Sequence, residues 1–340
     1  MQRSLQLARL GKGTAAPNPM VGSVIVFQGE IIGEGYHQQC GQAHAEVNAI
    51  NSVIDSDLLT QSTLYVNLEP CAHVGRTPAC STLIIQKKIP RVVIGCVDPF
   101  EKVAGKGIDM LKAAGVEVVV GVLEKESQWL NRCFFTFHQK KRPYIILKWA
   151  QTIDGFIDID RTDASVEPAW ITNELSRALV HKWRTEEPAI MVGTQTALKD
   201  NPQLNVRAWS GKEPLRITVD RDLRIPRSYH LYDDSQATLI FSNEIGQSGK
   251  NTEWVKLDNA QDINRQIFTT LYQKEIQSVI VEGGKEVLES LIAQNLWDEA
   301  RVFIGPKTFK KGVKAPIIDA KLLRKEWLND TELSYFIPFD

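Results

Sequence analysis

The stretch LEPCAHVGRTPAC, residues 68–80, links a predicted strand to a predicted helix and carries two cysteines. The preceding segment STLYVNLE has the apolar pattern of a half-buried strand, so Cys71 is expected just past its end. The dipeptide Thr77-Pro78 predicts a helix start, because threonine caps a first turn and proline needs no amide donor there. Cys80 is therefore expected in the first turn, where the positive end of the helix dipole favours a thiolate.

Three interpretations of Cys71 and Cys80 are open: a disulfide, two thiols packed in a core, or two ligands of one metal ion. A count of five cysteines in 340 residues is sparse and odd, unlike a disulfide-rich secreted domain. The stretch MQRSLQLARLGKG has the pattern of an amphipathic helix and lacks the apolar core of a secretion signal. We therefore expect a cytoplasmic protein, in which a disulfide is the least favoured interpretation.

The overall composition excludes two classes of partner. Hydrophobic residues make up 43% of the chain and charged residues 24%, with a net charge of −1. Acidic and basic residues are mixed along the sequence, so we expect no basic face that binds nucleic acid. No apolar run reaches the ~18–20 residues that a membrane-spanning helix needs. At this length, two domains are expected.

Outward from the opening stretch, predicted strands and helices alternate. A helix at 2–11, a hairpin around Gln28-Gly29 and the helix AEVNAINSVI come before it. The strand RVVIGCV, the helix GKGIDMLKAAG and the strand VEVVVGV come after it. Such alternation predicts an α/β fold with helices on both faces of a sheet. We predict a first domain at 1–125, a connecting helix and charged linker at 126–142, and a second α/β domain at 143–340.

A histidine and an acid upstream, in GQAHAEVNAI, extend the metal interpretation. His44 and Glu46 are expected where a helix begins, so two helix N-termini and a strand end can converge on one point. One histidine and two thiolates suit zinc, and three protein ligands leave the open position of a catalytic site. Zinc lowers the pKa of its water to roughly 7. Glu46 is then the candidate for carrying a proton to a departing amine.

Taken singly, each of these residues is better explained without a metal. Cys80 alone indicates helix packing, His44 a cap, and Glu46 an acid in a first turn. The combination matches the zinc-deaminase signature H-x-E…P-C-x-x-C, except that eight residues rather than two separate the cysteines.

That insert points to one branch of the deaminases. The run PCAHVGRTPAC, with APNPMVG at 16–22 and GEGYH…HAE, resembles the deaminase half of the bifunctional riboflavin-biosynthesis deaminase–reductase family. The resemblance implies a cytidine-deaminase-like α/β/α sandwich with a zinc ion. It further implies that His44, Cys71 and Cys80 hold the zinc, that Glu46 is the proton shuttle, that Asn18 holds the pyrimidine, and that His73 and Arg76 face the substrate. An arginine suits a phosphorylated substrate, since its fork can bind phosphate oxygens in pairs.

Spacing alone says less about the second domain. The segment VIVEGGKEVLESL is a predicted strand that turns at Gly283-Gly284 into a helix, a geometry in which backbone amides can meet a phosphate. It is not G-x-G-x-x-G, so a dinucleotide fold of the Rossmann kind is only weakly indicated. By spacing alone, a Gly-Gly pair after a strand is more often a plain tight turn. Arg184 and Arg207 are candidate phosphate binders, or simply surface residues.

Four further segments resemble the reductase half of the same family: ILKWAQTIDGFI, WITNELSR, VGTQTALKDNPQLNVR and VEGGKEVLESL. The resemblance implies a second domain similar to dihydrofolate reductase that uses NADPH. It implies that NADPH contacts Ala150, Trp170, Thr196, Asp200, Gly284, Lys285 and Glu286, that the phosphoribosyl substrate contacts Arg184, Leu204, Arg207 and Glu282, and that Lys148 and Asp154 flank the reacting carbon.

The chain departs from the family pattern at two positions. The segment before Trp170 is longer than usual, and Pro168 falls where a small hydroxyl residue usually contacts the substrate. Proline has no backbone N–H to donate. Arg221 falls near a serine that often meets the cofactor, and an arginine could instead grip the extra phosphate of NADPH.

The sequence therefore predicts a bifunctional enzyme: a zinc-dependent deaminase of a phosphoribosylated pyrimidine, followed by an NADPH-dependent reductase that converts the ribosyl group to ribityl. The alternative within enzymes is a monofunctional pyrimidine deaminase with an inactive reductase-like domain, and Pro168 is its main support. A nucleic-acid-editing deaminase is disfavoured because this sequence predicts no basic face. A zinc-stabilised scaffold is disfavoured because such a site would normally have a fourth protein ligand. The family resemblance also implies a homo-oligomer.

Overall fold

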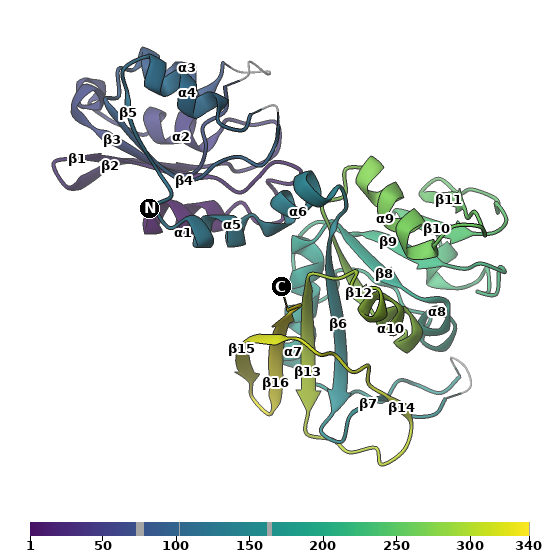
Figure 1. Cartoon of the computed structure of the whole chain (residues 1–340). Coiled ribbons are helices and arrows are strands. Elements are labelled where there is room, and N and C mark those ends of the chain that lie inside the picture. Colours follow the sequence, from purple (N-terminus) through teal and green to yellow (C-terminus); the bar gives the residue numbers. More distant parts are fainter. Residues whose placement is uncertain (73–77, 102, 162–164, 340) are drawn as a thin grey trace. The chain divides into compact units, whose positions relative to one another are not determined.

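The computed structural model describes residues 1–72, 78–101, 103–161 and 165–339 (Figure 1). The chain forms two compact units, Met1–Lys141 and Arg142–Asp340, and each is built on its own sheet. Helices α5 (Glu124–Leu130) and α6 (Arg132–Lys140) belong to the first unit.

The first unit contains a mixed sheet. The hairpin strands are antiparallel to each other, and the three strands that follow β1 in the sheet order are mutually parallel. In the described part of the chain the order is β2 (Glu30–Tyr36), β1 (Gly22–Phe27), β3 (Thr63–Leu68), β4 (Arg91–Cys96) and β5 (Glu117–Val120). The predicted hairpin around Gln28-Gly29 is confirmed.

Helices cover both faces of this sheet. A Cβ on Gly22 would meet the backbone of Ser4 in α1 (Gln2–Arg9), and a Cβ on Gly35 would meet Ala49 in α2 (Ala45–Asn51). Gly35 pairs with Ser23, the neighbour of Gly22, so the two glycines point to opposite faces. Figure 1 shows α1 and α5 on one side of the sheet, and α2, α3 (Cys80–Gln86) and α4 (Lys106–Ala113) on the other. With helices on both faces of the sheet (Figure 1), the predicted α/β/α sandwich is confirmed. A short 3-10 helix, η1 (Ser56–Gln61), precedes β3.

The start of α3 differs from the prediction. Ala79 is the N-cap and Cys80 the first helical residue, so Pro78 lies outside the helix and its predicted place in the first turn is wrong. The amide of Cys80 donates instead to the Cys71 sulfur. The place of Cys80 in the first turn is confirmed. Thr77 lies outside the described residues.

The second unit is built on a larger sheet that is mostly parallel. Among its described strands, only those at one edge run antiparallel to their neighbours, and these come from the C-terminal part of the sequence. In the described residues the order is β11 (Thr252–Lys256), β10 (Thr238–Ser242), β9 (Leu215–Val219), β8 (Ala189–Val192), β12 (Ser278–Glu282), β6 (Tyr144–Thr152), β13 (Glu299–Gly305), β16 (Thr331–Ile337) and β15 (Lys321–Leu328). A separate ribbon pairs β7 (Phe156–Asp158) with β14 (Val313–Lys314).

Alternation along β6 divides this unit into two faces. Leu147 and Trp149 enter a core that includes side chains of α9 (Ile263–Gln273) and α10 (Lys285–Ala293). Lys148 and Ala150 therefore lie on the opposite face. Phe303 pairs with Ala150, and its ring lies 5.5 Å from that of Trp183 in α7 (Glu174–Glu186). The remaining helices are α8 (Thr194–Asp200) and the short η2 (His230–Tyr232).

No helix in the described ranges is long and apolar enough to cross a membrane. The α/β architecture of both units agrees with the predicted fold class.

Candidate active sites

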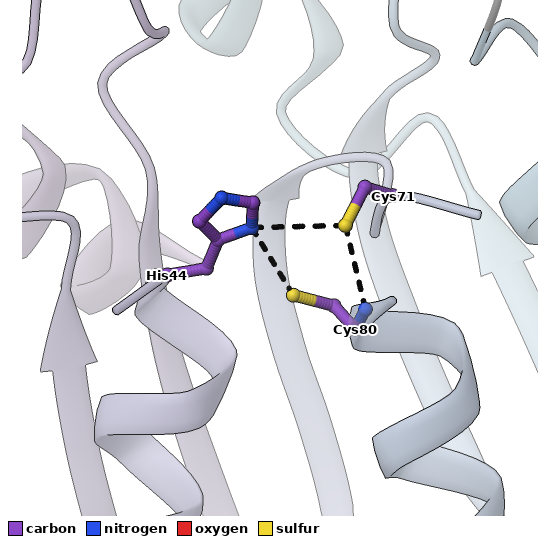
Figure 2. A group of neighbouring side chains, drawn as sticks. All are labelled: His44, Cys71 and Cys80. Carbon is purple, nitrogen blue, oxygen red and sulfur yellow. Dashed lines mark hydrogen bonds between the residues drawn. The ribbon is translucent and has the colours of Figure 1, made fainter. Parts of the chain in front are cut away.

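Three side chains from separate elements of the first unit meet at one point (Figure 2). His44 is the N-cap of α2, Cys71 follows β3, and Cys80 opens α3. The His44 Nδ1 atom lies 3.6 Å from the sulfur of Cys71 and 3.3 Å from that of Cys80. All three donor atoms lie within 4.8 Å of one another. The structure thus brings together the three residues that the sequence predicts as metal ligands.

The electrostatics of this cluster favour a cation. A hydrogen bond from the Cys80 thiol is the main reason why the pKa of Cys71 is lowered to about 4, whereas the pKa of Cys80 is raised by the same interaction. Two sulfurs this close can therefore both be thiolates only with a positive charge between them. One imidazole and two thiolates are the donors that zinc prefers, and no fourth His, Cys, Asp or Glu joins the group among the described residues. The site fits a catalytic zinc ion.

Glu46 lies beside this cluster in the first turn of α2 and is 3% exposed. Burial raises the pKa of its carboxyl to about 7. A carboxyl group that titrates near neutral pH can both accept and donate a proton.

Asn18 and His37 form a chain of contacts that ends at His44. The Nδ2 atom of Asn18 is 3.0 Å from His37 Nε2, and the His37 ring meets the His44 ring edge-on with a centroid distance of 5.5 Å. Burial lowers the pKa of His37. The prediction named Asn18 but not His37, although His37 ends the quoted motif GEGYH; its buried position beside the ligand emerges only from the fold.

The second unit contains a cavity of about 1000 Å³ on the α7 side of the sheet. Residues from β6, α7, α8 and the turn after β12 line it. All but one of the predicted reductase residues are among them: Lys148, Ala150, Trp170, Arg184, Thr196, Asp200, Leu204, Arg207, Glu282, Gly284, Lys285 and Glu286.

Buried charged side chains line part of this cavity. Glu282 accepts from Arg184 at 2.9 Å and lies 3.7 Å from the Lys148 ammonium group. Burial opposes ionisation of Glu282, but the two cations outweigh it and lower its pKa to about 2. Burial lowers the pKa of Lys148, and the attraction of the Glu282 carboxylate partly offsets this effect. Glu282 therefore holds one arginine and one lysine in fixed positions at the cavity wall.

Among the cavity residues that were not predicted are two buried polar side chains, Arg161 and His181. Arg161 is buried and joins Asp158 at 2.8 Å to Asp200 at 2.5 Å, so it fixes the carboxylate predicted to contact NADPH. The unusual length of the segment that carries it was its one signal in the sequence. His181 in α7 is also buried, and its Nδ1 has no hydrogen-bond partner among the described residues. Burial, aided by nearby arginines, lowers the pKa of His181 to about 4.

The two sites correspond to two known domains. The cytidine and deoxycytidylate deaminase zinc-binding region matches residues 1–96, and the RibD C-terminal domain matches residues 143–333. Riboflavin biosynthesis protein RibD of Aquifex aeolicus is 39% identical over 318 residues, which are 92% of this chain and 88% of that protein. The corresponding protein of Actinobacillus pleuropneumoniae is 40% identical, over 93% of this chain and 86% of that one.

The chain belongs to the RibD family.

Solved structures agree with this assignment. A Thermotoga maritima protein described as a diaminohydroxyphosphoribosylaminopyrimidine deaminase/5-amino-6-(5-phosphoribosylamino)uracil reductase is 36% identical, with a TM-score of 0.90. The match covers 100% of this chain and 97% of that one. Acinetobacter baumannii RibD is 30% identical with a TM-score of 0.88, over 100% and 98% of the two chains. As a RibD-family protein, the chain is a bifunctional enzyme of riboflavin biosynthesis, a deaminase that uses zinc and a reductase that uses NADPH.

Three predicted residues of this RibD-family chain are not placed in a site. His73 and Arg76 lie outside the described residues, so their roles stay predictions. Asp154 is not brought to the large cavity: its carboxylate accepts from the Thr152 hydroxyl at 2.6 Å and from the backbone N–H of Lys310 at 2.8 Å. Asp154 thus ties two loops together.

The two departures from the RibD pattern lie in different surroundings. Pro168 lines the large cavity, next to the predicted substrate and cofactor residues. Arg221 is exposed after β9 and is not among the described residues that line the cavity.

Proposed function

We propose that the first half hydrolyses one exocyclic amine of a diamino-hydroxy-phosphoribosylamino-pyrimidine, and that the second half reduces the ribosyl group of the product to ribityl. The observation that carries this proposal is the pairing, in one chain, of a His44–Cys71–Cys80 cluster beside the buried Glu46 with a charge-lined cavity of about 1000 Å³. The solved Thermotoga maritima protein is described by both of these activities.

In the deaminase site, His44, Cys71 and Cys80 would hold zinc, which when bound supplies a water that ionises near neutral pH. Glu46 would take one proton from the attacking water and give it to the ring nitrogen as the oxygen bonds to the ring carbon. The same carboxyl group would then pass the second proton of that oxygen to the amine as the carbon–nitrogen bond breaks and ammonia leaves. Asn18 holds the pyrimidine ring, and His73 and Arg76 complete the substrate site.

In the reductase site, the cavity would hold NADPH, which supplies the hydride. Arg184 and Arg207 bind the phosphoribosyl group, and Glu282 fixes Arg184 by a 2.9 Å ion pair. Lys148 lies on the same face of β6 as Ala150 and next to Glu282, so its ammonium group faces the reacting sugar. The backbone amides after Gly284 and the carboxylate of Asp200 position the cofactor.

Two readouts from one reaction test the proposal. Purified protein receives the phosphoribosylamino-pyrimidine and NADPH, and ammonia release and NADPH oxidation are followed together, with Glu46→Gln as the comparison. We expect both signals in the wild type, and loss of both in Glu46→Gln, since the reductase then lacks its substrate. We also expect Glu46→Gln to oxidise NADPH when the deaminated pyrimidine is supplied directly.

Other results would contradict the proposal in distinct ways. Ammonia release without NADPH oxidation would favour the monofunctional deaminase. Pro168 would then be the first residue to replace by the small hydroxyl residue that is usual at this position. If folded, zinc-loaded protein gave neither ammonia release nor NADPH oxidation, the proposed substrate would be wrong.

We further propose that the enzyme is cytoplasmic and forms a homo-oligomer through its second unit. All five cysteines are free thiols, which agrees with a reducing compartment. The edge strand β15 exposes Leu322, Leu323 and Trp327, a surface that a second copy could cover. Sedimentation of the wild type and of Trp327→Glu tests the assembly: a smaller species is expected only for the variant.

A further inference from the structure

The loop that carries Asn18 is held in place by two asparagines. The Met20 amide donates to Asn131 Oδ1 at 2.8 Å. The Met20 carbonyl accepts from Asn67 Nδ2 at 3.0 Å and from Asn131 Nδ2 at 2.9 Å. The Asn18 amide donates to the Ala15 carbonyl at 2.9 Å. The backbone around Asn18 is therefore fixed, and only its side-chain amide remains to be oriented.

His37 fixes that orientation through its own tautomer. His37 Nδ1 lies 3.1 Å from the Ala43 carbonyl oxygen, which can only accept a hydrogen bond. The proton of the neutral ring is therefore on Nδ1, and Nε2 carries a lone pair. The Asn18 Nδ2 atom, which can only donate, lies opposite Nε2, so this ring nitrogen is the acceptor. Only the NH2 end of the Asn18 amide can donate to that lone pair, across 3.0 Å.

The other end of the amide is then left for a ligand. Asn18 is half-buried, and its Oδ1 has no hydrogen-bond partner among the described residues. The Asn18 amide contacts His37, whose ring in turn meets the ring of the predicted ligand His44 edge-on, so this chain of contacts links the amide to the metal cluster. A carbonyl oxygen accepts hydrogen bonds only, so it recognises a ring N–H or an amino group and not a ring nitrogen lone pair.

We propose that His37 is a positioning residue of the deaminase: it locks the Asn18 amide so that Oδ1 faces the pyrimidine as an acceptor and selects a ring edge that carries a donor. This inference rests on the proposed role of Asn18 in holding the pyrimidine. Without the lock, the amide is free to rotate, and it can offer NH2 and oxygen in turn.

A matched pair of variants tests the lock. Leucine in place of His37 fills a buried site of similar size but cannot accept from Asn18, whereas glutamine keeps an acceptor oxygen. We expect His37→Leu to lower kcat/KM for ammonia release about 10-fold, mainly by raising KM, because one oriented hydrogen bond to substrate is lost. We expect His37→Gln to stay within about threefold of wild type. Zinc content and NADPH oxidation with the deaminated pyrimidine check that both variants are folded.

A double-mutant cycle with Asn18→Ala separates positioning from mere packing. If His37 acts through Asn18, the loss caused by His37→Leu disappears in the Asn18→Ala background. Losses that add, or equal losses in His37→Leu and His37→Gln, would overturn the inference while leaving the role of Asn18 intact. Wild-type kinetics for Asn18→Ala would overturn the proposed role of Asn18 itself, and the inference with it.

Discussion

The residues of the metal cluster show how two thiols are made to depend on a cation. Cys71 and Cys80 share one hydrogen bond, and together they approach a single nitrogen of His44. We predict that Cys71→Ser or Cys80→Ser releases zinc, because a serine hydroxyl is not ionised at neutral pH and is a poor zinc ligand. Metal analysis of purified protein measures this directly. The exposed Cys40→Ser is the control and should keep its zinc; a full zinc content in either cluster variant would show that the ligand set is wrong.

Glu282 makes the stability of the second unit depend on pH. Its pKa is lowered to about 2, from 4.5, so ionised Glu282 stabilises the fold by about 3 kcal/mol. Because the folded-state pKa is the lower one, this contribution is complete above pH 4.5 and is lost as the pH falls towards 2. We predict that Glu282→Gln lowers the thermal midpoint of the second unit at pH 7. The difference from wild type should shrink between pH 5 and pH 3, and a difference that stays constant would contradict the assignment.

For single residues, the sequence predicted the site roles that depend on a local pattern and missed the roles that depend on partners outside that pattern. His44, Glu46, Cys71 and Cys80 lie in short motifs at helix starts or a strand end, so their convergence followed from the order of elements. His37 and Arg161 act through Ala43 and Asp200, and no spacing in the sequence indicates those pairs. Asp154 follows β6 as predicted, but the N–H groups of a loop more than 150 residues away hold its carboxylate.

At the scale of elements, Glu69 joins the end of β3 to the start of α4. Its carboxylate is buried and accepts from the backbone N–H groups of Gly105 and Gly107 at 3.0 and 2.9 Å. These are amides at the N-terminus of α4, which helix geometry leaves without partners. Gly107 also packs so closely on the Pro70 carbonyl that a Cβ would lie 2.0 Å from it. Both contacts fix the backbone one and two residues before Cys71.

We predict that Glu69→Gln destabilises the first unit by about 1–3 kcal/mol, because an amide NH2 would face backbone donors. Denaturant unfolding of the first unit, with and without zinc, measures the loss. The exposed Glu117→Gln, whose side chain pairs with Arg91 at the surface, should change stability far less. Similar losses in the two variants would mean that Glu69 does not anchor α4.

Predicted elements were most accurate where many of the side chains are buried. The strands β3, β4 and β6 have short apolar runs and the helix α7 has an apolar face, and their predicted positions agree with the structure. Strand β15 is exposed along most of its length, so the alternation that reveals a strand is absent from KLLRKEWL. The start of α3 was misplaced because Cys71 sulfur, not a side chain of the helix start, accepts from Cys80.

At the scale of the whole molecule, each unit has a sheet and a hydrophobic core of its own. We therefore predict two unfolding transitions in calorimetry, and a chelator that removes zinc should lower only the one that belongs to the first unit. Chelation should also abolish ammonia release while NADPH oxidation with the deaminated pyrimidine continues. If both transitions shift equally, the two units do not unfold independently.

Asn131 limits where nature or an engineer could recombine the two halves. It lies beyond the stretch matched by the zinc-binding domain and beyond the predicted boundary at residue 125, yet both ends of its amide hold the Met20 backbone next to Asn18. A hybrid joined at residue 96 or 125 would take the loop that carries Asn18 and Met20 from one parent, and Asn131, which holds that loop, from the other. The natural crossover point therefore lies after Lys141, and a gene that encoded a free-standing deaminase would need to retain the two helices that the shorter domain definition omits.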